Sequence, residues 1–167
     1  MSTEYHNIPP VFDENSKLLI LGSFPSVKSR EAQFFYGHPQ NRFWRVISTL
    51  CGEKCPVTVD EKKKMLLSHG IAVWDVIASC EISGSSDSSI KNAVPNDLSV
   101  ILERADIKAV FCNGGTAYNL YKKYMEERTG QKAVKLPSTS PANAAWTLEK
   151  LISEWGRIID IKNSSSL

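Results

Sequence analysis

Short apolar runs alternate along this chain with segments whose apolar residues recur at helical spacing. Four runs are continuous and short, as expected of buried strands: Lys17–Ser23, Ile71–Ile77, Ile107–Asn113 and Lys132–Pro137. Helical spacing begins at Asn41 and covers Val59–Gly70, the residues from Leu98 to Ala105, those from Ala117 to Tyr124, and a last segment from about Asn143 to Ile159. This alternation predicts an α/β fold with a mostly parallel sheet and helices on both of its faces.

The predicted strands are each followed by an unusual polar segment. These segments are Gly22–Ser26, Asp75 with the Ser-rich residues behind it, Asn113–Gly115 and Leu136–Asn143. Ligands of parallel sheets bind beyond the carboxyl ends of the strands, so all four segments should gather at one edge. The residues between Gly22 and Asn41, and those from Ser79 to Asp97, are expected to be loops. A single domain over residues 1–162 and a disordered tail at 163–167 complete the predicted layout.

Composition narrows the class of protein only slightly. The 167 residues carry a net charge of +2, too small a value to indicate a nucleic-acid binder. There is no apolar run of membrane-spanning length and no secretory signal pattern, which predicts a cytoplasmic protein without membrane contact. Cys80 and Cys112 end apolar runs and are expected to be buried thiols, although a four-thiolate iron–sulfur cluster stays an alternative.

Common catalytic motifs are missing from the sequence. It contains no P-loop, no G-x-G-x-x-G, no H-E-x-x-H and no G-x-S-x-G, and its three histidines are far apart. No metal and no cofactor is therefore expected. What remains is neutral: asparagines and many serines, which hold phosphates well, beside the aromatic run Phe34–Tyr36, which could stack on a base. The alternatives are solvated turns for the serines and core packing for the aromatics.

Four motifs in order carry a family resemblance. They are G-S-F-P-S at 22–26, F-Y-x-H-P-x-N-R-F-W at 35–44, F-x-N-G at 111–114 and L-P-S-T-S-P-A-N at 136–143. With them the chain resembles the uracil-DNA glycosylase superfamily, and within it the hypoxanthine-DNA (deoxyinosine) glycosylase branch. The resemblance implies a three-layer α/β/α sandwich. It also implies an enzyme of base-excision repair that flips a deaminated base out of DNA and hydrolyses its N-glycosidic bond without a metal or cofactor.

The resemblance also implies catalytic roles. Many relatives carry an Asn or Asp where this chain has Phe24, and that side chain positions the attacking water. In the hypoxanthine branch this role passes to the Asn of the N-R-F-W element, which is Asn41 here. The alternative for Asn41 is a helix N-cap. His38 is expected to brace its loop or to donate a hydrogen bond to the leaving base.

Base recognition is assigned in the same way. Tyr36 matches the aromatic that stacks on the flipped base, with Phe35 as second choice, and Phe24 shapes the pocket. Asn113 matches the base-reading Asn. One amide can donate to a keto oxygen and accept from the adjacent ring N–H, a pair that hypoxanthine and uracil share and that adenine and cytosine reverse.

DNA contacts complete the expected site. The candidates are Ser26, Arg42, Ser86, Ser88, Ser138, Ser140, Ala142 and Asn143. Ala142 stands where relatives often place a Leu wedge, so it is a short wedge. Arg42 could pair with Asp75 or reach a phosphate. Asp75 is the candidate if a carboxylate base exists, and otherwise has a structural role; no carboxylate pair is evident in the sequence.

The resulting prediction is a monomeric, monofunctional enzyme that removes hypoxanthine from DNA. Three alternatives stay open: a uracil or mismatch-specific glycosylase, a nucleic-acid-binding module without activity, and a nucleosidase acting on free inosine. The loss of the usual catalytic side chain at Phe24 favours hypoxanthine over uracil.

Overall fold

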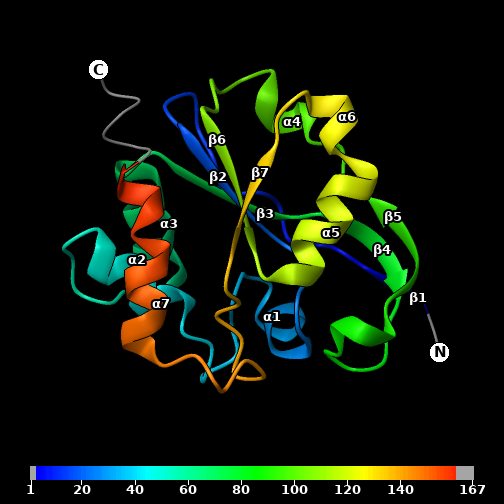
Figure 1. Ribbon diagram of the computed structural model, residues 1–167, viewed down its shortest axis with the longest axis horizontal. Helices are drawn as coiled ribbons and strands as arrows, with labels where there is room; N and C mark the ends of the chain where they lie inside the picture. The colour runs from blue at the N-terminus through cyan, green and yellow to red at the C-terminus, as the bar shows by residue number, and fades with distance from the viewer. Residues whose placement is uncertain (1–2, 161–167) are drawn as a thin grey trace.

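The computed structural model describes residues 3–160, so the predicted tail at 163–167 lies outside the described residues. Its central sheet has four parallel strands in the order β3 (Ile71–Asp75), β2 (Leu18–Gly22), β6 (Ala109–Asn113) and β7 (Ala133–Leu136). All four predicted strands are therefore confirmed. In register, Gly22 lies opposite Asp75, and Asn113 opposite Leu136, so the carboxyl ends meet at one edge, the lower one in Figure 1.

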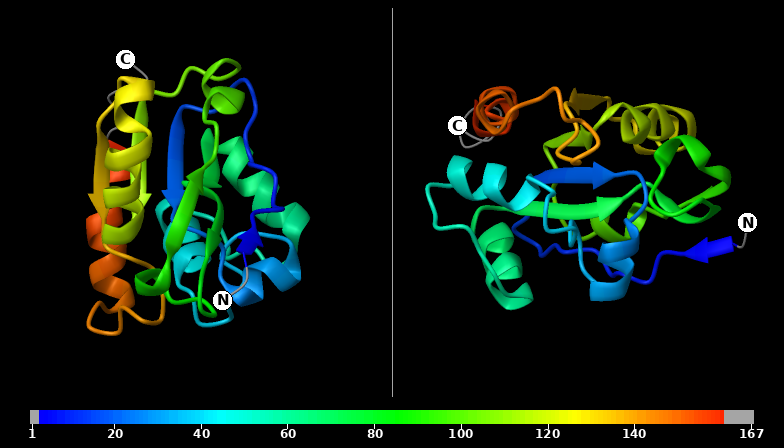
Figure 2. Two further views of the ribbon diagram at one scale, coloured as in Figure 1. Left: turned by 90° about the vertical axis from the view of Figure 1, so that its right-hand side faces the viewer. Right: turned by 90° about the horizontal axis from the view of Figure 1, so that it is seen from below.

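Helices cover both faces of this sheet. They are α2 (Phe43–Leu50), α3 (Val59–Ser68), α4 (Ser99–Leu102), α5 (Gly115–Tyr124), α6 (Glu126–Thr129) and α7 (Leu148–Trp155). The left view in Figure 2 shows α5 and α6 on one side of the strands and α3 on the other, while α7 packs against α2. The predicted three-layer α/β/α sandwich is confirmed. Within residues 3–160, no helix has the length and apolar character needed to cross a bilayer.

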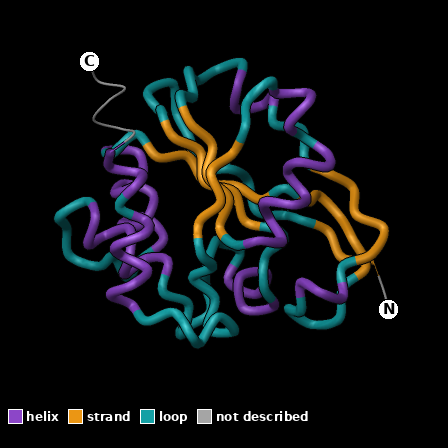
Figure 3. Tube along the Cα trace, in the orientation of Figure 1, coloured by secondary structure: helices purple, strands orange, loops and turns teal. Residues whose placement is uncertain are grey.

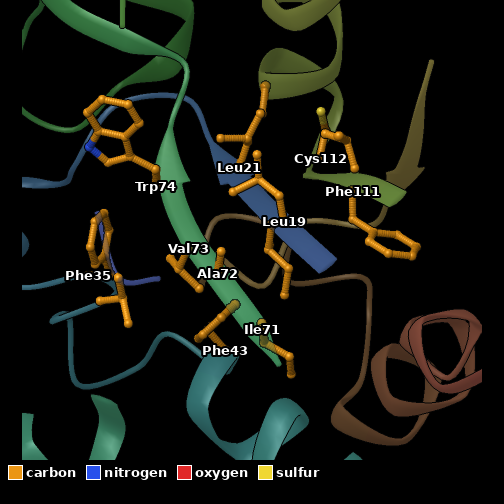
Figure 4. Close-up of a cluster of buried hydrophobic side chains, with 14 of the residues drawn as sticks. Leu19, Leu21, Phe35, Phe43, Ile71, Ala72, Val73, Trp74, Phe111 and Cys112 are labelled. Carbon is orange, nitrogen blue, oxygen red and sulfur yellow. The ribbon is translucent and has the colours of Figure 1, made fainter. Parts of the chain in front are cut away.

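The core lies between the sheet and its helices. Every residue of β2 is buried, because this strand has neighbours on both edges and helices over both faces. Figure 4 shows Phe35 and Phe43 close to β3, and Phe111 on β6. Burying one such side chain contributes about 1.5–3 kcal/mol. Cys80 and Cys112 are buried, as expected, and all four cysteines are free thiols.

The expected loop from Ser79 to Asp97 was wrong, since it contains most of a second sheet. This sheet is antiparallel, in the order β1 (Thr3–Tyr5), β4 (Ile77–Glu81) and β5 (Lys91–Pro95), with the short 3₁₀ helix η1 (Asp87–Ser89) before β5. Figure 3 shows it beside the central sheet. No residue of β5 is buried, and the strand shows no alternation of buried apolar and exposed polar residues. Its extended form therefore comes from backbone pairing with β4, which hydrophobic periodicity does not reveal.

Two further boundaries differ from the prediction. The expected loop after Gly22 contains a short helix, α1 (Val27–Ala32), whose N-terminus is capped by Ser26. The last helix begins at Leu148 rather than at Asn143, because the Thr147 side chain accepts the backbone N–H of Lys150 and so caps the helix there. Residues 143–146 are thereby left in the loop that follows β7.

Candidate active site

A pocket of about 340 Å³ lies at the carboxyl edge of the central sheet, large enough for one nucleobase. The right view in Figure 2 looks at the molecule from this edge. All four predicted polar segments contribute to the pocket wall. The lining residues are Gly22, Ser23, Phe24, Pro25, Ser26, Ser29, Phe35, Tyr36, His38, Asn41, Asp75, Ser85, Asp87, Asn113, Ser138, Thr139, Ser140, Pro141 and Ala142. The expected convergence of the strand ends is confirmed.

Asp75 forms one wall of the pocket and is bonded to a histidine that the sequence did not indicate. Its Oδ2 lies 2.8 Å from Nε2 of His6, whose side chain is 1% exposed. Nδ1 of His6 accepts the backbone N–H of Ile8 at 3.3 Å, so Nε2 carries the proton and donates to the carboxylate. The partner of Asp75 is therefore His6, and the ion pair suggested between Arg42 and Asp75 was wrong.

Gly22 leaves the space that Asp75 and Tyr36 occupy. A Cβ at this position would lie 2.4 Å from Oδ1 of Asp75 and 3.1 Å from the Tyr36 hydroxyl oxygen. Both atoms belong to packed side chains on the pocket wall. The glycine at the end of β2 is thus required by close approach, not by its backbone angles.

Tyr36 places its hydroxyl inside the protein. Its φ is 52°, in the left-handed region, and its ring stacks on Phe43 with centroids 4.0 Å apart. The hydroxyl is buried and makes no hydrogen bond within the described residues. Burial raises the pKa of this phenol, and the charge of Asp75 raises it further, while the neighbouring Asn113 amide offsets part of the shift. Tyr36 is therefore a neutral group with an unused donor on the pocket wall.

Phe24 and Phe35 make the apolar part of the wall. Both are buried, and both pack against the ring of His6, with centroids 6.2 Å and 6.1 Å away. The Arg30 guanidinium lies over Phe24, 5.5 Å from the ring centroid. Phe24 is thus a ring packed between the side chains of His6 and Arg30 and offers no hydrogen-bonding group to the pocket.

Asn41 and Asn113 are joined by a residue that the sequence did not indicate, Thr139. The Asn113 amide donates to Oγ1 of Thr139 at 3.0 Å and accepts the Thr139 backbone N–H at 3.0 Å. Oγ1 of Thr139 donates to Oδ1 of Asn41 at 2.8 Å, and the same Oδ1 accepts the backbone N–H of Phe43 at 2.9 Å. Thr139 is completely buried. The two asparagines are therefore fixed relative to each other across three segments of the chain.

Arg42 fastens the loop that follows β7. Its guanidinium donates to the carbonyl oxygens of Ser140 at 2.9 Å and Asn143 at 3.1 Å, and to that of Trp146. The Asn143 amide donates to the carbonyl of Ser138 at 3.0 Å. Both side chains hold the loop rather than line the pocket. Ser138, Ser140 and Ala142 of this loop do line it.

The Ser-rich loop brings a second carboxylate to the pocket. Asp87 accepts the hydroxyl of Ser23 at 2.8 Å, while Ser86 and Ser88 bond to each other at 3.0 Å, are exposed and do not line the pocket. Burial raises the pKa of Asp87; the Ser23 hydrogen bond lowers it in part, and the charge of Asp75 raises it. Asp75 and Asp87 thus form a carboxylate pair that the sequence did not reveal.

The raised pKa of Asp87 has a consequence for stability. The Asp87 carboxyl group holds its proton more tightly in the folded than in the unfolded chain. Its contribution to the stability of the fold is therefore complete below the pKa that it has in the unfolded chain, and is lost as the pH rises through its pKa in the folded chain. Asp87 keeps much of its surface exposed, so solvent screens part of this penalty. We expect Asp87→Asn, which keeps an acceptor for Ser23, to melt only slightly higher than wild type at pH 7, by less than about 2–4 °C. Thermal unfolding between pH 3 and pH 8 measures this; the advantage should vanish below about pH 4.

Asp106→Asn is the matched control for Asp87→Asn. Asp106 is exposed, and its pKa is lowered by the hydrogen bond and the charge of Lys108. Its replacement should not raise the melting temperature at pH 7. If Asp87→Asn were no more stable than wild type at pH 7, the negative charge of Asp87 would not destabilise the folded protein.

Most predicted site residues lie on the pocket wall. Those that line it are Phe24, Ser26, Phe35, Tyr36, His38, Asn41, Asn113, Ser138, Ser140 and Ala142. His38 also accepts the backbone N–H of Gln40 through Nδ1 at 3.1 Å. Sequence reasoning missed His6, Ser23 and Thr139 as parts of the site. Ser23 and Thr139 had a local signal, since each stands inside a recognised motif, whereas His6 had none.

The described residues hold no group of three His, Cys, Asp or Glu side chains arranged to bind a metal. The pocket instead combines an apolar wall, two asparagines, hydroxyl groups and two carboxylates at the carboxyl edge of a parallel sheet. This combination of fold and site defines an α/β/α protein whose pocket has a size and a lining that suit a flat, polar-edged ring such as a nucleobase. The model of the uracil DNA glycosylase superfamily matches residues 9–157, and the chain belongs to this superfamily.

Two relatives and one solved structure are similar to most of this chain. A hypoxanthine DNA glycosylase from Methanosarcina acetivorans is 36% identical over 148 residues, which cover 88% of this chain and 92% of the relative. One from Methanosarcina barkeri is 36% identical over 108 residues, 64% of this chain and 68% of the relative. A solution NMR structure of a M. acetivorans protein provisionally assigned as a uracil DNA glycosylase superposes with a TM-score of 0.79, at 34% identity, over 93% of this chain and 95% of the other.

Proposed function

We propose that this protein is a DNA glycosylase that removes hypoxanthine from DNA containing deoxyinosine, as a monomer acting inside the cell. The relatives named hypoxanthine DNA glycosylase support this substrate. The observation that carries the proposal is the set of hydrogen-bonding groups that Asn113 leaves free. After its two bonds to Thr139, this amide keeps one N–H and one lone pair, enough to pair with a keto oxygen and its adjacent ring N–H.

The remaining roles follow from the pocket. Tyr36 and Phe35 offer rings beside Asn113 for stacking on the extruded base, and Phe24 closes the apolar wall. Asn41 holds the attacking water, and His38 braces the loop that carries it. Ser26, Ser138 and Ser140 contact phosphates at the mouth of the pocket, with Ser86 and Ser88 beyond it. Arg42 and Asn143 support DNA binding by holding the loop around Ala142 in shape.

A base-release panel tests the function. The purified chain is incubated with duplex oligonucleotides bearing inosine, uracil or a thymine mismatch, and strand cleavage after alkali is measured. We expect cleavage at inosine. Cleavage at uracil without cleavage at inosine would assign the protein to uracil, the second candidate, because Asn113 reads both bases equally well. No cleavage of any substrate would leave only DNA binding, and turnover of free inosine would indicate a nucleosidase.

A further inference from the structure

We infer that Asn41 donates a hydrogen bond to the attacking water, because Thr139 fixes the orientation of the Asn41 amide. In the same inference, the carboxylate of Asp75 is the group that accepts the proton of this water. The inference rests on the proposed function. It assigns Thr139 as a positioning residue and Asp75 as a catalytic residue.

Two backbone N–H groups fix the direction of every hydrogen bond in the Asn41–Thr139–Asn113 network. The Thr139 N–H can only donate, so its partner on Asn113 is the amide oxygen, and the Asn113 nitrogen donates to Oγ1 of Thr139. Oγ1 then directs its own proton to Asn41. At the other end the backbone N–H of Phe43 identifies its partner on Asn41 as the oxygen. The orientation of both amides therefore follows from groups whose polarity is certain.

The consequence for Asn41 is that its oxygen is fully used. An amide oxygen has two lone pairs, and here one accepts from Phe43 and the other from Thr139. Asn41 lines the pocket, and no hydrogen bond within residues 3–160 uses its Nδ2. Asn41 can thus offer the water only N–H groups. Its N–H groups donate to the oxygen of the water, and it has no lone pair left to receive a water proton.

A proton acceptor must then come from another part of the wall. Oδ2 of Asp75 is bonded by His6, which keeps the carboxylate in place, but no hydrogen bond of the described residues uses Oδ1. Oδ1 adjoins Gly22 at the end of β2. The other carboxylate, Asp87, receives the hydroxyl of Ser23 through its Oδ1 and belongs to the short, mostly exposed helix η1, whereas Asp75 ends the buried strand β3 of the central sheet. Asp75 is therefore the carboxylate whose free oxygen has the more firmly fixed position.

The chemical step balances with these groups alone. The bond between C1′ and the base nitrogen breaks, and its electron pair leaves with the base. The water oxygen, held by Asn41, bonds to C1′, and one water proton passes to Asp75. The departing base takes a proton from solvent, and Asp75 returns its own to solvent. A negative Asp75 also stabilises the positive charge that develops on the sugar.

Asn41→Asp separates donor from acceptor action. An aspartate keeps an oxygen for Phe43 and Thr139 but replaces the N–H groups by a second oxygen. We expect the single-turnover rate on inosine DNA to fall about 100-fold or more, with unchanged affinity for DNA by fluorescence anisotropy. Since wild type and Asn41→Asp are compared on one substrate, an Asn41→Asp protein within about threefold of wild type overturns the inference but leaves the proposed function intact.

Thr139 and Asp75 provide the second test. Thr139→Val keeps the shape of the side chain and removes the hydroxyl, whereas Thr139→Ser keeps the hydroxyl. We expect the single-turnover rate of Thr139→Val to fall at least about tenfold, with unchanged affinity for DNA, when it is measured well below the melting temperature of the variant. The rate of Thr139→Ser should be close to that of wild type. Asp75→Asn, which turns the free oxygen into a donor, should lose about 100-fold. Equal rates for the two Thr139 variants, or an Asp75→Asn protein as fast as wild type, overturn the inference.

Discussion

An Asn41→Ala protein should fold and bind DNA but release hypoxanthine about 10²–10⁴-fold more slowly than wild type. The variant removes the group proposed to hold the water. The other asparagine of the described pocket, Asn113, is held in place by Thr139 and is proposed to pair with the base, so it does not replace Asn41. Stability should fall by about 1 kcal/mol, since Phe43 at the start of α2 loses the acceptor of its N–H. Single-turnover kinetics and thermal unfolding measure the two effects.

Thr58→Ala is the matched control for this variant. Thr58 caps α3 through a capping box with Glu61, and it does not line the pocket. Its replacement should cost a similar free energy of unfolding and leave the glycosylase rate unchanged. If Asn41→Ala slowed the reaction no more than Thr58→Ala did, Asn41 would have only its structural role at the start of α2.

A Gly22→Ala protein should lose both stability and activity. The added Cβ would lie 2.4 Å from Oδ1 of Asp75, a distance that real Cβ atoms do not adopt, so Asp75 or β2 must move. Asp75 is held by His6 on one side, and β2 is paired with strands on both edges. We expect a loss of about 1–3 kcal/mol in the free energy of unfolding. A displacement of about 1 Å at the site should slow base release about 100-fold.

Gly115→Ala provides the comparison for Gly22. A Cβ there would make an ordinary contact, 3.6 Å from the end of Lys135, and α5 begins at this residue. Alanine should leave the rate unchanged and not lower the melting temperature. A Gly22→Ala enzyme with wild-type activity would mean that the position of Asp75 does not matter for the reaction.

The central sheet could be predicted because its strands carry their signal locally. The run Leu18–Gly22 is short and apolar at nearly every position, a pattern typical of a strand covered on both faces. The second sheet could not be predicted in this way. Lys91–Pro95 has no buried residue and lies at an edge, and its pairing with β4 includes irregularities in register. Its conformation depends on partners and not on periodicity.

The site shows the same division. The polar segments after the strands, and the residues that the family motifs mark in them, could be located from the sequence. The hydrogen bonds that give those residues their chemistry could not. His6 reaches Asp75 across 69 positions, and Thr139 reaches Asn41 across 98. Such pairs depend on the course of the backbone between them, which local patterns do not describe.

The sequence by itself determined the fold class, the edge at which the site lies and the residue types available there, because periodicity and turn residues act over a few positions. Only the tertiary structure decided which lone pairs and protons face the pocket. Thr139 and the N–H of Phe43 use both lone pairs of the Asn41 oxygen, and His6 leaves one oxygen of Asp75 free. A hydrogen bond requires donor and acceptor within about 3 Å in a defined direction, and only the folded chain creates that arrangement.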